Sequence, residues 1–251
     1  MQSPTDHAFT APDGTRLAWH ELGEGRPVVL IHGLFSSAGV NWIKYGHAAA
    51  IAARGFRVIM PDLRAHGDSD APTEPARYPP DVIVDDAAAL IGHLGLTDFD
   101  LGGYSLGGRT TVRLLVRGLK PRRAVVAGMG LSGILDPEPR AANFRRIVGA
   151  LGTFKRGDPE FMVQAFLKTT GGKPDALLPL LRSFLPTTRE ELQGIDSDTL
   201  VLIGDEDDEN GSAQDLADLL GRARLATVPG GHMSCITRPE FGQAIASFLA
   251  A

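Results

Sequence analysis

Cysteine pairs and long apolar runs are both missing from this chain of 251 residues. Its single cysteine, Cys235, cannot form an internal disulfide, which suits a reducing compartment. We interpret Cys235 as a packing residue, because no further histidine follows it to act as its base. No apolar stretch approaches the roughly 20 residues of a membrane-spanning helix. Residues 1–13 are polar and lack the basic start and apolar core of a signal peptide. We therefore expect a soluble cytoplasmic protein with no membrane partner.

A strong excess of one charge is also missing. The chain has 25 Lys and Arg against 30 Asp and Glu, a net charge of −5, so nothing in its charge points to a nucleic-acid partner. Apolar residues make up 43% of the sequence, which is ordinary for a globular protein. The length suits one α/β domain over residues 1–251, with a sizeable core.

The chain does contain a G-x-S-x-G motif, GYSLG at residues 103–107, centred on Ser105. Such a motif places a serine on a sharp turn between a strand and a helix, where its hydroxyl can act as a nucleophile. The predicted strand at 99–104 and the predicted helix at 106–117 are consistent with that turn. Because the chain has 30 glycines, the pentapeptide also arises readily by chance, so the hypothesis depends on partners elsewhere.

A nucleophilic serine needs a histidine base and an acid that orients the histidine. In proteins with this turn, the chain order is serine, acid, histidine. Seven histidines are present, and only His232 follows Ser105. His232 lies in a loop after the apolar run 225–228, so it is the only candidate for the base.

The acid is expected after a strand that lies between the serine and the histidine. The apolar run 200–203 fits a buried parallel strand, and it leads into a cluster of carboxylates. At most one of these can face the histidine. We prefer Asp207, with Asp205 and Asp208 as alternatives, and Asp136 as a more distant one.

Short β-type runs alternate with helical ones along most of the chain. The predicted strands lie near 16–22, 28–31, 57–60, 99–104, 124–127, 199–203 and 224–228, and the predicted helices near 48–54, 82–94, 106–117, 213–220 and 239–249. This alternation predicts an α/β fold with a mostly parallel central sheet and helices on both faces. Ser105, Asp207 and His232 each follow a strand, so we expect them at the carboxyl edge of the sheet.

Residues 131–186 interrupt this alternation, because they contain no convincing strand. Helices are expected near 140–151, 160–169 and 176–184, and the segment is rich in Phe and Leu. Insertions of this length are often lids or binding segments. Most of the large side chains must pack the helices together, and Phe144 and Phe161 are the candidates for lining a pocket above the serine.

Together these segments resemble the α/β-hydrolase superfamily over nearly the whole chain. Residues 29–35, VLIHGLF, are similar to the His-Gly loop after the third strand of that family, and residues 61–69, PDLRAHGDS, are similar to its D-x-R-G-H-G-x-S segment. A G-x-x-D pattern that ends at Asp207 matches the family's acid position, and a Gly-His pair that ends at His232 matches its histidine position.

The resemblance implies an α/β-hydrolase fold with a small helical cap at about 131–186. It also implies that the backbone N–H groups of Leu34 and Leu106 form an oxyanion hole. The chemistry it implies requires no metal and no organic cofactor. Two residues depart from the family pattern: Ala65 replaces a glycine of the loop at 61–69, and Tyr104 precedes the serine where many relatives have histidine.

The expected function is that of a carboxylesterase-like serine hydrolase acting on small-molecule esters with small to medium apolar acyl groups. Phe35 and Tyr104 join Phe144 and Phe161 as candidate substrate-binding residues. Similar scaffolds also support hydrolysis of a carbon–carbon bond next to a ketone, or perhydrolysis. A low-turnover ligand receptor of the same fold is the alternative outside enzymes.

Overall fold

The structure is a computed structural model, and it describes residues 3–251. One sheet contains the eight strands β1 (Thr5–Thr10), β2 (Arg16–Leu22), β3 (Arg26–Ile31), β4 (Phe56–Pro61), β5 (Asp100–Tyr104), β6 (Arg123–Ala127), β7 (Asp198–Gly204) and β8 (Ala223–Val228). The α-helices are α1 (His47–Ala52), α2 (Val82–His93), α3 (Leu106–Val116), α4 (Leu131–Leu135), α5 (Glu138–Gly149), α6 (Phe161–Thr169), α7 (Pro174–Leu180), α8 (Arg189–Gln193), α9 (Ala213–Leu219) and α10 (Pro239–Ala250).

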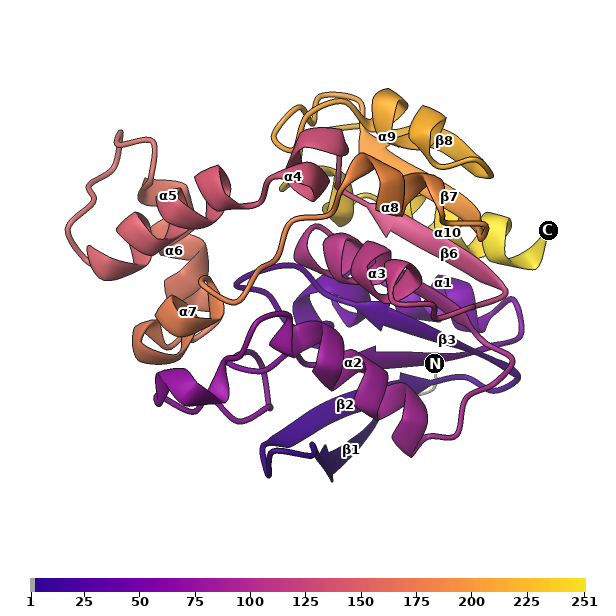
Figure 1. The fold of residues 1–251 in the computed structure, drawn as a ribbon, viewed down its shortest axis with the longest axis horizontal. Helices are drawn as coiled ribbons and strands as arrows, with labels where there is room; N and C mark the ends of the chain where they lie inside the picture. Colours follow the sequence, from indigo (N-terminus) through magenta and orange to yellow (C-terminus); the bar gives the residue numbers. More distant parts are fainter. Residues whose placement is uncertain (1–2) are drawn as a thin grey trace.

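The sheet is mixed and mostly parallel, as the alternation of strands and helices predicts. Its strand order is β1-β2-β4-β3-β5-β6-β7-β8, and only the β1–β2 and β2–β4 pairs are antiparallel. The carboxyl ends of the parallel strands therefore meet along one edge (Figure 1). This is the α/β-hydrolase fold, and Ser105 directly follows β5 in the middle of the sheet.

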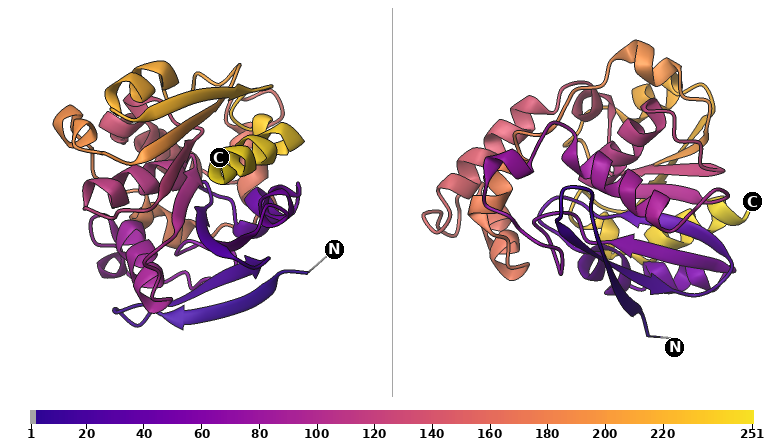
Figure 2. Two further views of the ribbon diagram at one scale, coloured as in Figure 1. Left: turned by 90° about the vertical axis from the view of Figure 1, so that its right-hand side faces the viewer. Right: turned by 60° about the horizontal axis from the view of Figure 1, so that its bottom comes forward.

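Both faces of the sheet are covered by helices, as Figure 2 shows. Successive side chains of a strand point to opposite faces. In β3, Val29 and Ile31 pack into a core with α2 and α3, whereas Val28 and Leu30 pack into a second core with α1 and α10. All four side chains are fully buried, which explains the continuous apolar run of this strand.

The first strand, β1, and two short helices, α4 and α8, were not predicted from the sequence. Every β1 residue except Phe9 is exposed, so the strand lacks the alternation of apolar and polar residues that marks a half-buried strand. It forms by antiparallel pairing with β2 along its whole length. Helix α8 has a signal that the sequence analysis missed. Thr188 accepts the N–H of Glu191, and the Glu191 carboxylate accepts the N–H of Thr188, which is a capping box.

Between β6 and β7, residues 131–186 form α4 to α7 and contain no strand, in agreement with the sequence. Helices α5, α6 and α7 lie together beyond the carboxyl ends of the strands (Figure 1). Their large side chains serve mainly to pack these helices. Val148, Leu167, Leu177 and Leu180 are almost completely buried in one apolar cluster.

Candidate active site

Ser105 occupies the sharp turn between β5 and α3. Its backbone has φ 54° and ψ −113°, a conformation that a residue with a side chain rarely adopts. The N–H of Ser105 donates to the carbonyl of Ala127 at 2.7 Å, which ties the turn to the end of β6. The turn holds the Ser105 hydroxyl at the carboxyl edge of the sheet, in the arrangement that the G-x-S-x-G pattern predicts.

The two glycines of the motif are required by close backbone contacts. A Cβ on Gly103 would lie 2.2 Å from the carbonyl carbon of Gly107, and a Cβ on Gly107 would lie 2.0 Å from the carbonyl oxygen of Ile31. Both distances are far below van der Waals contact, so only glycine fits either position without a backbone shift. The same contacts bring the loop after β3 against the turn that carries Ser105.

His232 and Asp207 complete a continuous hydrogen-bonded chain with Ser105. The Nε2 atom of His232 lies 3.0 Å from Ser105 Oγ, and its Nδ1 atom lies 2.8 Å from Asp207 Oδ2. Both side chains are buried. A serine, a histidine and a carboxylate in this order can move a proton from the serine to the histidine, while the carboxylate fixes the tautomer.

Asp207 is the only one of the four candidate acids that reaches His232. Asp205 accepts the N–H of Gly230 at 2.7 Å instead, and this bond closes the loop that carries the histidine. Asp208 and Asp136 are exposed. The other oxygen of Asp207 accepts the N–H of Glu209 at 3.2 Å, so the carboxylate is held from both sides.

Tyr104 contacts His232 in two ways. Its ring packs against the His232 imidazole with centroids 5.2 Å apart, and its hydroxyl donates to the backbone carbonyl of His232. Burial raises the pKa of the Tyr104 hydroxyl well above its usual range, so it stays a donor. The sequence analysis proposed Tyr104 as a substrate contact. The structure buries it in the core beneath the site, where it can orient the histidine loop.

The loop after β3 is fixed by side chains that accept its backbone N–H groups. Asn41 accepts from Gly33 at 2.9 Å, His66 accepts from Phe35 at 3.0 Å, and Asp62 accepts from Ala38 at 2.8 Å. These bonds were not foreseen from the sequence, which showed only that residues 61–69 resemble a segment of the family.

Two backbone N–H groups near Ser105 remain available. Within residues 3–251, neither the N–H of Leu34 nor that of Leu106 has an acceptor. Leu34 lies between the two bonded N–H groups of Gly33 and Phe35, and Leu106 is the first residue of α3, where helix N–H groups have no partner in the helix. Both residues border the same cavity as Ser105.

His66 must be neutral for its role, because Nε2 can accept the Phe35 N–H only when it carries no proton. Complete burial lowers the pKa of His66 to about 3, which keeps it neutral. Its other nitrogen, Nδ1, donates to the carbonyl of Arg64 at 2.9 Å. The adjacent His32 is also fully buried, and burial lowers its pKa as well; its Nε2 accepts the N–H of Leu63 at 3.0 Å.

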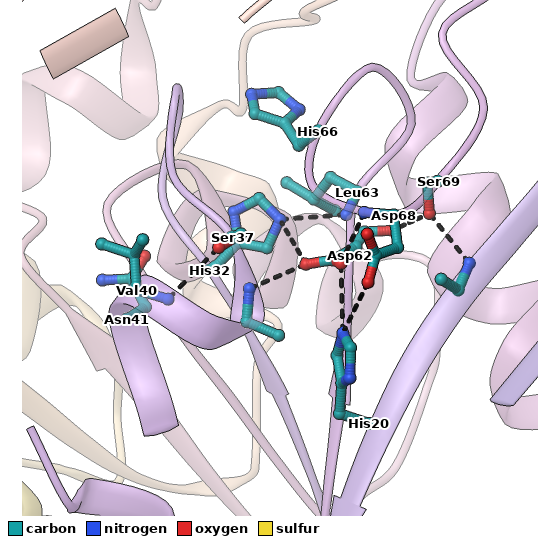
Figure 3. Close-up of polar contacts among 12 residues, drawn as sticks. His20, His32, Ser37, Val40, Asn41, Asp62, Leu63, His66, Asp68 and Ser69 are labelled. Atoms are coloured by element: carbon teal, nitrogen blue, oxygen red, sulfur yellow. Dashed lines mark hydrogen bonds and ion pairs between the residues drawn. The ribbon is translucent and has the colours of Figure 1, made fainter. Parts of the chain in front are cut away.

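Asp62 links the loop after β3 to His20 on β2, as Figure 3 shows. It accepts the N–H groups of Ala38 and Asp68, and its Oδ2 lies 3.2 Å from His20 Nε2. The Asp62 hydrogen bond, against some opposing burial, raises the pKa of His20 to about 9. Burial acts to raise the pKa of Asp62, but the hydrogen bonds outweigh it and lower that pKa to about 2. At neutral pH the two form an ion pair.

His20, Asp62 and Asp68 are also close enough together to be considered as metal ligands. His20 Nδ1 lies 2.7 Å from Asp6 Oδ1, so both ring nitrogens face carboxylates. A doubly protonated imidazole has no lone pair to offer a metal. We therefore interpret the three residues as an ion-paired cluster that supports the loop after β3.

The cavity beside Ser105 has an empty volume of about 420 Å³, part of which is open to solvent. Its wall is mainly apolar and includes Leu34, Leu106, Met129, Ala141, Phe144 and Phe184. Of the four substrate-binding candidates, only Phe144 lies on this wall. Phe35 is buried behind it, with its ring edge-to-face against Phe144 at 5.3 Å, and Phe161 lies on α6 outside the lining. The sequence analysis missed Arg109, which lines the cavity one helical turn after the serine.

We predict that His66→Ala reduces kcat for a substrate turned over at Ser105 by about tenfold and raises KM much less. Loss of the acceptor for the Phe35 N–H loosens the loop that holds the Leu34 amide, and small displacements at a reacting centre are costly. His66→Gln, which keeps an acceptor oxygen, should recover part of the rate. Steady-state kinetics beside thermal unfolding checks this. A variant that loses stability but keeps its kcat would show that His66 is purely structural.

We predict that His20→Gln changes the pH dependence of stability. The pKa of His20 is raised from 6.5 to about 9, so the ion pair stabilises the protein fully below about pH 6.5 and is lost as the pH rises through about 9. The variant should therefore lose most stability, relative to the parent, below pH 6.5, and the two curves should converge above pH 9. Urea unfolding across this range measures the difference, with His7→Gln on the exposed strand β1 as control. A constant difference at every pH would contradict the ion pair.

No helix within residues 3–251 is both long and apolar enough to cross a membrane.

Residues 28–241 match the model of the alpha/beta hydrolase family. The 2-hydroxymuconate semialdehyde hydrolase of Pseudomonas sp. (strain CF600) is 33% identical over 146 residues, which cover 54% of this chain but only half, 50%, of that relative. The non-heme haloperoxidase of Rhodococcus erythropolis is 28% identical over 263 residues, which cover 92% of this chain and 94% of the relative. The crystal structure of a hydrolase from Pseudomonas aeruginosa PA01 superposes with a TM-score of 0.80 at 25% identity, and the match covers 98% of this chain and 99% of that one. The sheet order, the strained serine turn and the extent of the family match together establish that the chain belongs to the alpha/beta hydrolase family.

Proposed function

We propose that the chain is a serine hydrolase that cleaves carboxylic esters of small to medium apolar acyl groups through an acyl-enzyme. The observation that carries this proposal is the unbroken chain from Ser105 Oγ through His232 to Asp207, at the wall of an apolar cavity. Leu34 and Leu106 border the same cavity, and we propose that their N–H groups supply the oxyanion hole that acyl transfer needs.

In the first half of the reaction, the Ser105 hydroxyl attacks the ester carbonyl carbon as His232 Nε2 accepts its proton. Asp207 holds the Nδ1–H of the imidazole, fixes its tautomer and stabilises its cationic form. The Tyr104 hydroxyl, bonded to the His232 carbonyl, keeps the loop in register with the serine. The tetrahedral intermediate then collapses as His232 gives the proton to the leaving alcohol, and the acyl group stays on Ser105.

The oxygen that gains negative charge is proposed to lie between the N–H groups of Leu34 and Leu106. In other hydrolases the loss of one such donor costs roughly 10²- to 10³-fold in rate. Asn41 and His66, which accept the N–H groups of Gly33 and Phe35, fix the loop that carries the Leu34 amide before the substrate arrives, so little reorganisation is needed during the reaction. In the second half, water attacks the acyl-enzyme with His232 as the base, and the acid product leaves.

The apolar wall supports a preference for apolar acyl groups. Each buried methylene contributes about 0.8 kcal/mol until the cavity is full. Phe144 from α5 and Phe184, which follows α7, close the wall from the side of the 131–186 segment. We propose that this segment acts as a cap that limits acyl length, with Phe144 as the side chain that sets the limit.

We predict that Ser105→Ala and His232→Ala each reduce ester hydrolysis by up to about a million-fold without unfolding the protein, because the members of a triad act as a unit. A series of p-nitrophenyl esters of increasing acyl length, with a β-diketone and a perhydrolysis assay in parallel, measures the rates. A fluorophosphonate should label Ser105 in the parent. Labelling without turnover on any substrate would instead indicate a ligand receptor, and full activity in folded Ser105→Ala protein would refute the mechanism.

We predict that Asp207→Asn reduces kcat by about 10⁴-fold, because an amide favours the wrong histidine tautomer. Asp205→Asn is the matched control. It lies on the same loop and keeps an oxygen that can accept the Gly230 N–H, so its loss should stay below about tenfold. The two variants are compared by kcat and by melting temperature. Comparable losses in both would mean that Asp207 is not the orienting acid.

A further inference from the structure

Arg109 is a buried cation on the wall of the cavity that holds Ser105. It lies four residues after the serine on α3, and its N–H donates to the Ser105 carbonyl at 2.9 Å, so both residues belong to the same face of the helix. Its side chain lines the cavity together with Leu34 and Leu106, the two residues whose amides are available. Only 4% of Arg109 is exposed to solvent.

The charge of Arg109 has no carboxylate partner among the residues that the structure describes. Asp81, whose field acts on Arg109, is held by Arg113 at 2.5 and 2.9 Å. One Arg109 nitrogen, Nη2, donates to the carbonyl of Leu185, but Nε is fully buried with no acceptor. The guanidinium also lies over the Phe184 ring, 5.4 Å from its centroid.

An unpaired charge in such surroundings is costly, and buried charges in proteins are usually paired. Burial lowers the pKa of Arg109 only to about 10, so the side chain is still a cation at neutral pH. The cavity lining within residues 3–251 contains no acidic side chain, and its other charged residue, Arg140, is paired with Glu209. The wall of the cavity therefore has one positive charge that no carboxylate among the described residues balances, that of Arg109, and is otherwise mainly apolar.

We propose that Arg109 binds a carboxylate carried by the substrate, so that the preferred esters are anionic at one end and apolar between that end and the scissile bond. This inference rests on the proposed ester hydrolysis and specifies its substrate class. The planar guanidinium suits a carboxylate, to which it can donate two parallel hydrogen bonds. A bound carboxylate would supply the charged partner that Arg109 lacks and would offset the buried cation.

The carboxylate can belong to the acyl part or to the alcohol part of the ester, and two substrate pairs distinguish these sources. Mono-p-nitrophenyl adipate is compared with p-nitrophenyl hexanoate for the acyl side, and 4-acetoxybenzoate is compared with 4-methylphenyl acetate for the alcohol side. The quantity measured is the ratio of kcat/KM for the anionic ester to that for its neutral partner. Comparing this ratio between variants cancels intrinsic differences in ester reactivity.

In Arg109→Met, the ratio should fall by about tenfold or more for one of the two pairs, mainly through KM, as expected when a charge-assisted hydrogen bond is lost. Arg109→Lys keeps the charge but cannot donate two parallel hydrogen bonds, so its ratio should lie between those of the parent and Arg109→Met. It also provides the test if the methionine variant folds poorly. Arg117→Met is the control, because Arg117 is a half-exposed residue just after α3, about two turns beyond Arg109, and pairs with Asp85 outside the cavity. Its ratio should match that of the parent.

The proposal is overturned if the ratio is the same in the parent and in the Arg109 variants for both pairs, including the case in which anionic and neutral esters lose rate in parallel. That result would leave Arg109 as a structural contact between α3 and the Phe184–Leu185 segment and would not affect the proposed ester hydrolysis. If no ester is turned over, the proposed function fails, and binding decides the inference separately. Thermal stabilisation by adipate in the parent that is lost in Arg109→Met would still support the carboxylate site, and equal stabilisation or none would refute it.

Discussion

The crowding of backbone between β3, β5 and α3 is the constraint on which the rest of the site depends. Gly103 meets Gly107 across the turn, and Gly107 meets the end of β3, at distances that leave no room for a Cβ. This contact forces Ser105 into its rare conformation and brings the loop after β3 alongside it. Ser105, the proposed nucleophile, and the loop that carries the Leu34 amide are thus positioned by close main-chain packing.

Around this rigid centre, side chains with no part in bond making fix what the backbone leaves free. Asn41, His66 and Asp62 accept three N–H groups on the loop after β3, whereas the Leu34 N–H has no partner among residues 3–251. The arrangement needs a neutral His66 and an ionised Asp62, and burial and ion pairing set their pKa values accordingly. The Tyr104 hydroxyl fixes the loop that carries His232, because it donates to the backbone carbonyl of His232. The site is thereby organised before any substrate binds, which is the condition for electrostatic stabilisation of a transition state.

The parallel core of the fold could be predicted because buried strands and amphipathic helices leave periodic patterns, whereas β1 could not, since its polar sequence forms a strand only by pairing with β2. Chain order and spacing pointed to Ser105, His232 and Asp207, which the structure brings within hydrogen-bond distance. The sequence did not show in which direction the side chains near the serine point. Tyr104 and Phe35 are buried behind the site, and Phe161 lies outside the cavity. Arg109 could have been suspected, because a residue four after the serine shares its helix face.

Ser105, activated by His232, is proposed to carry the acyl group between the two halves of the reaction. This role is tested by mixing the protein with p-nitrophenyl butyrate, quenching with acid within milliseconds, and measuring the intact and peptide masses. We expect a burst of p-nitrophenol close to one equivalent of protein, with one butyryl group on the peptide that contains Ser105. Turnover with no adduct, or an adduct on another residue such as Cys235, would contradict this role.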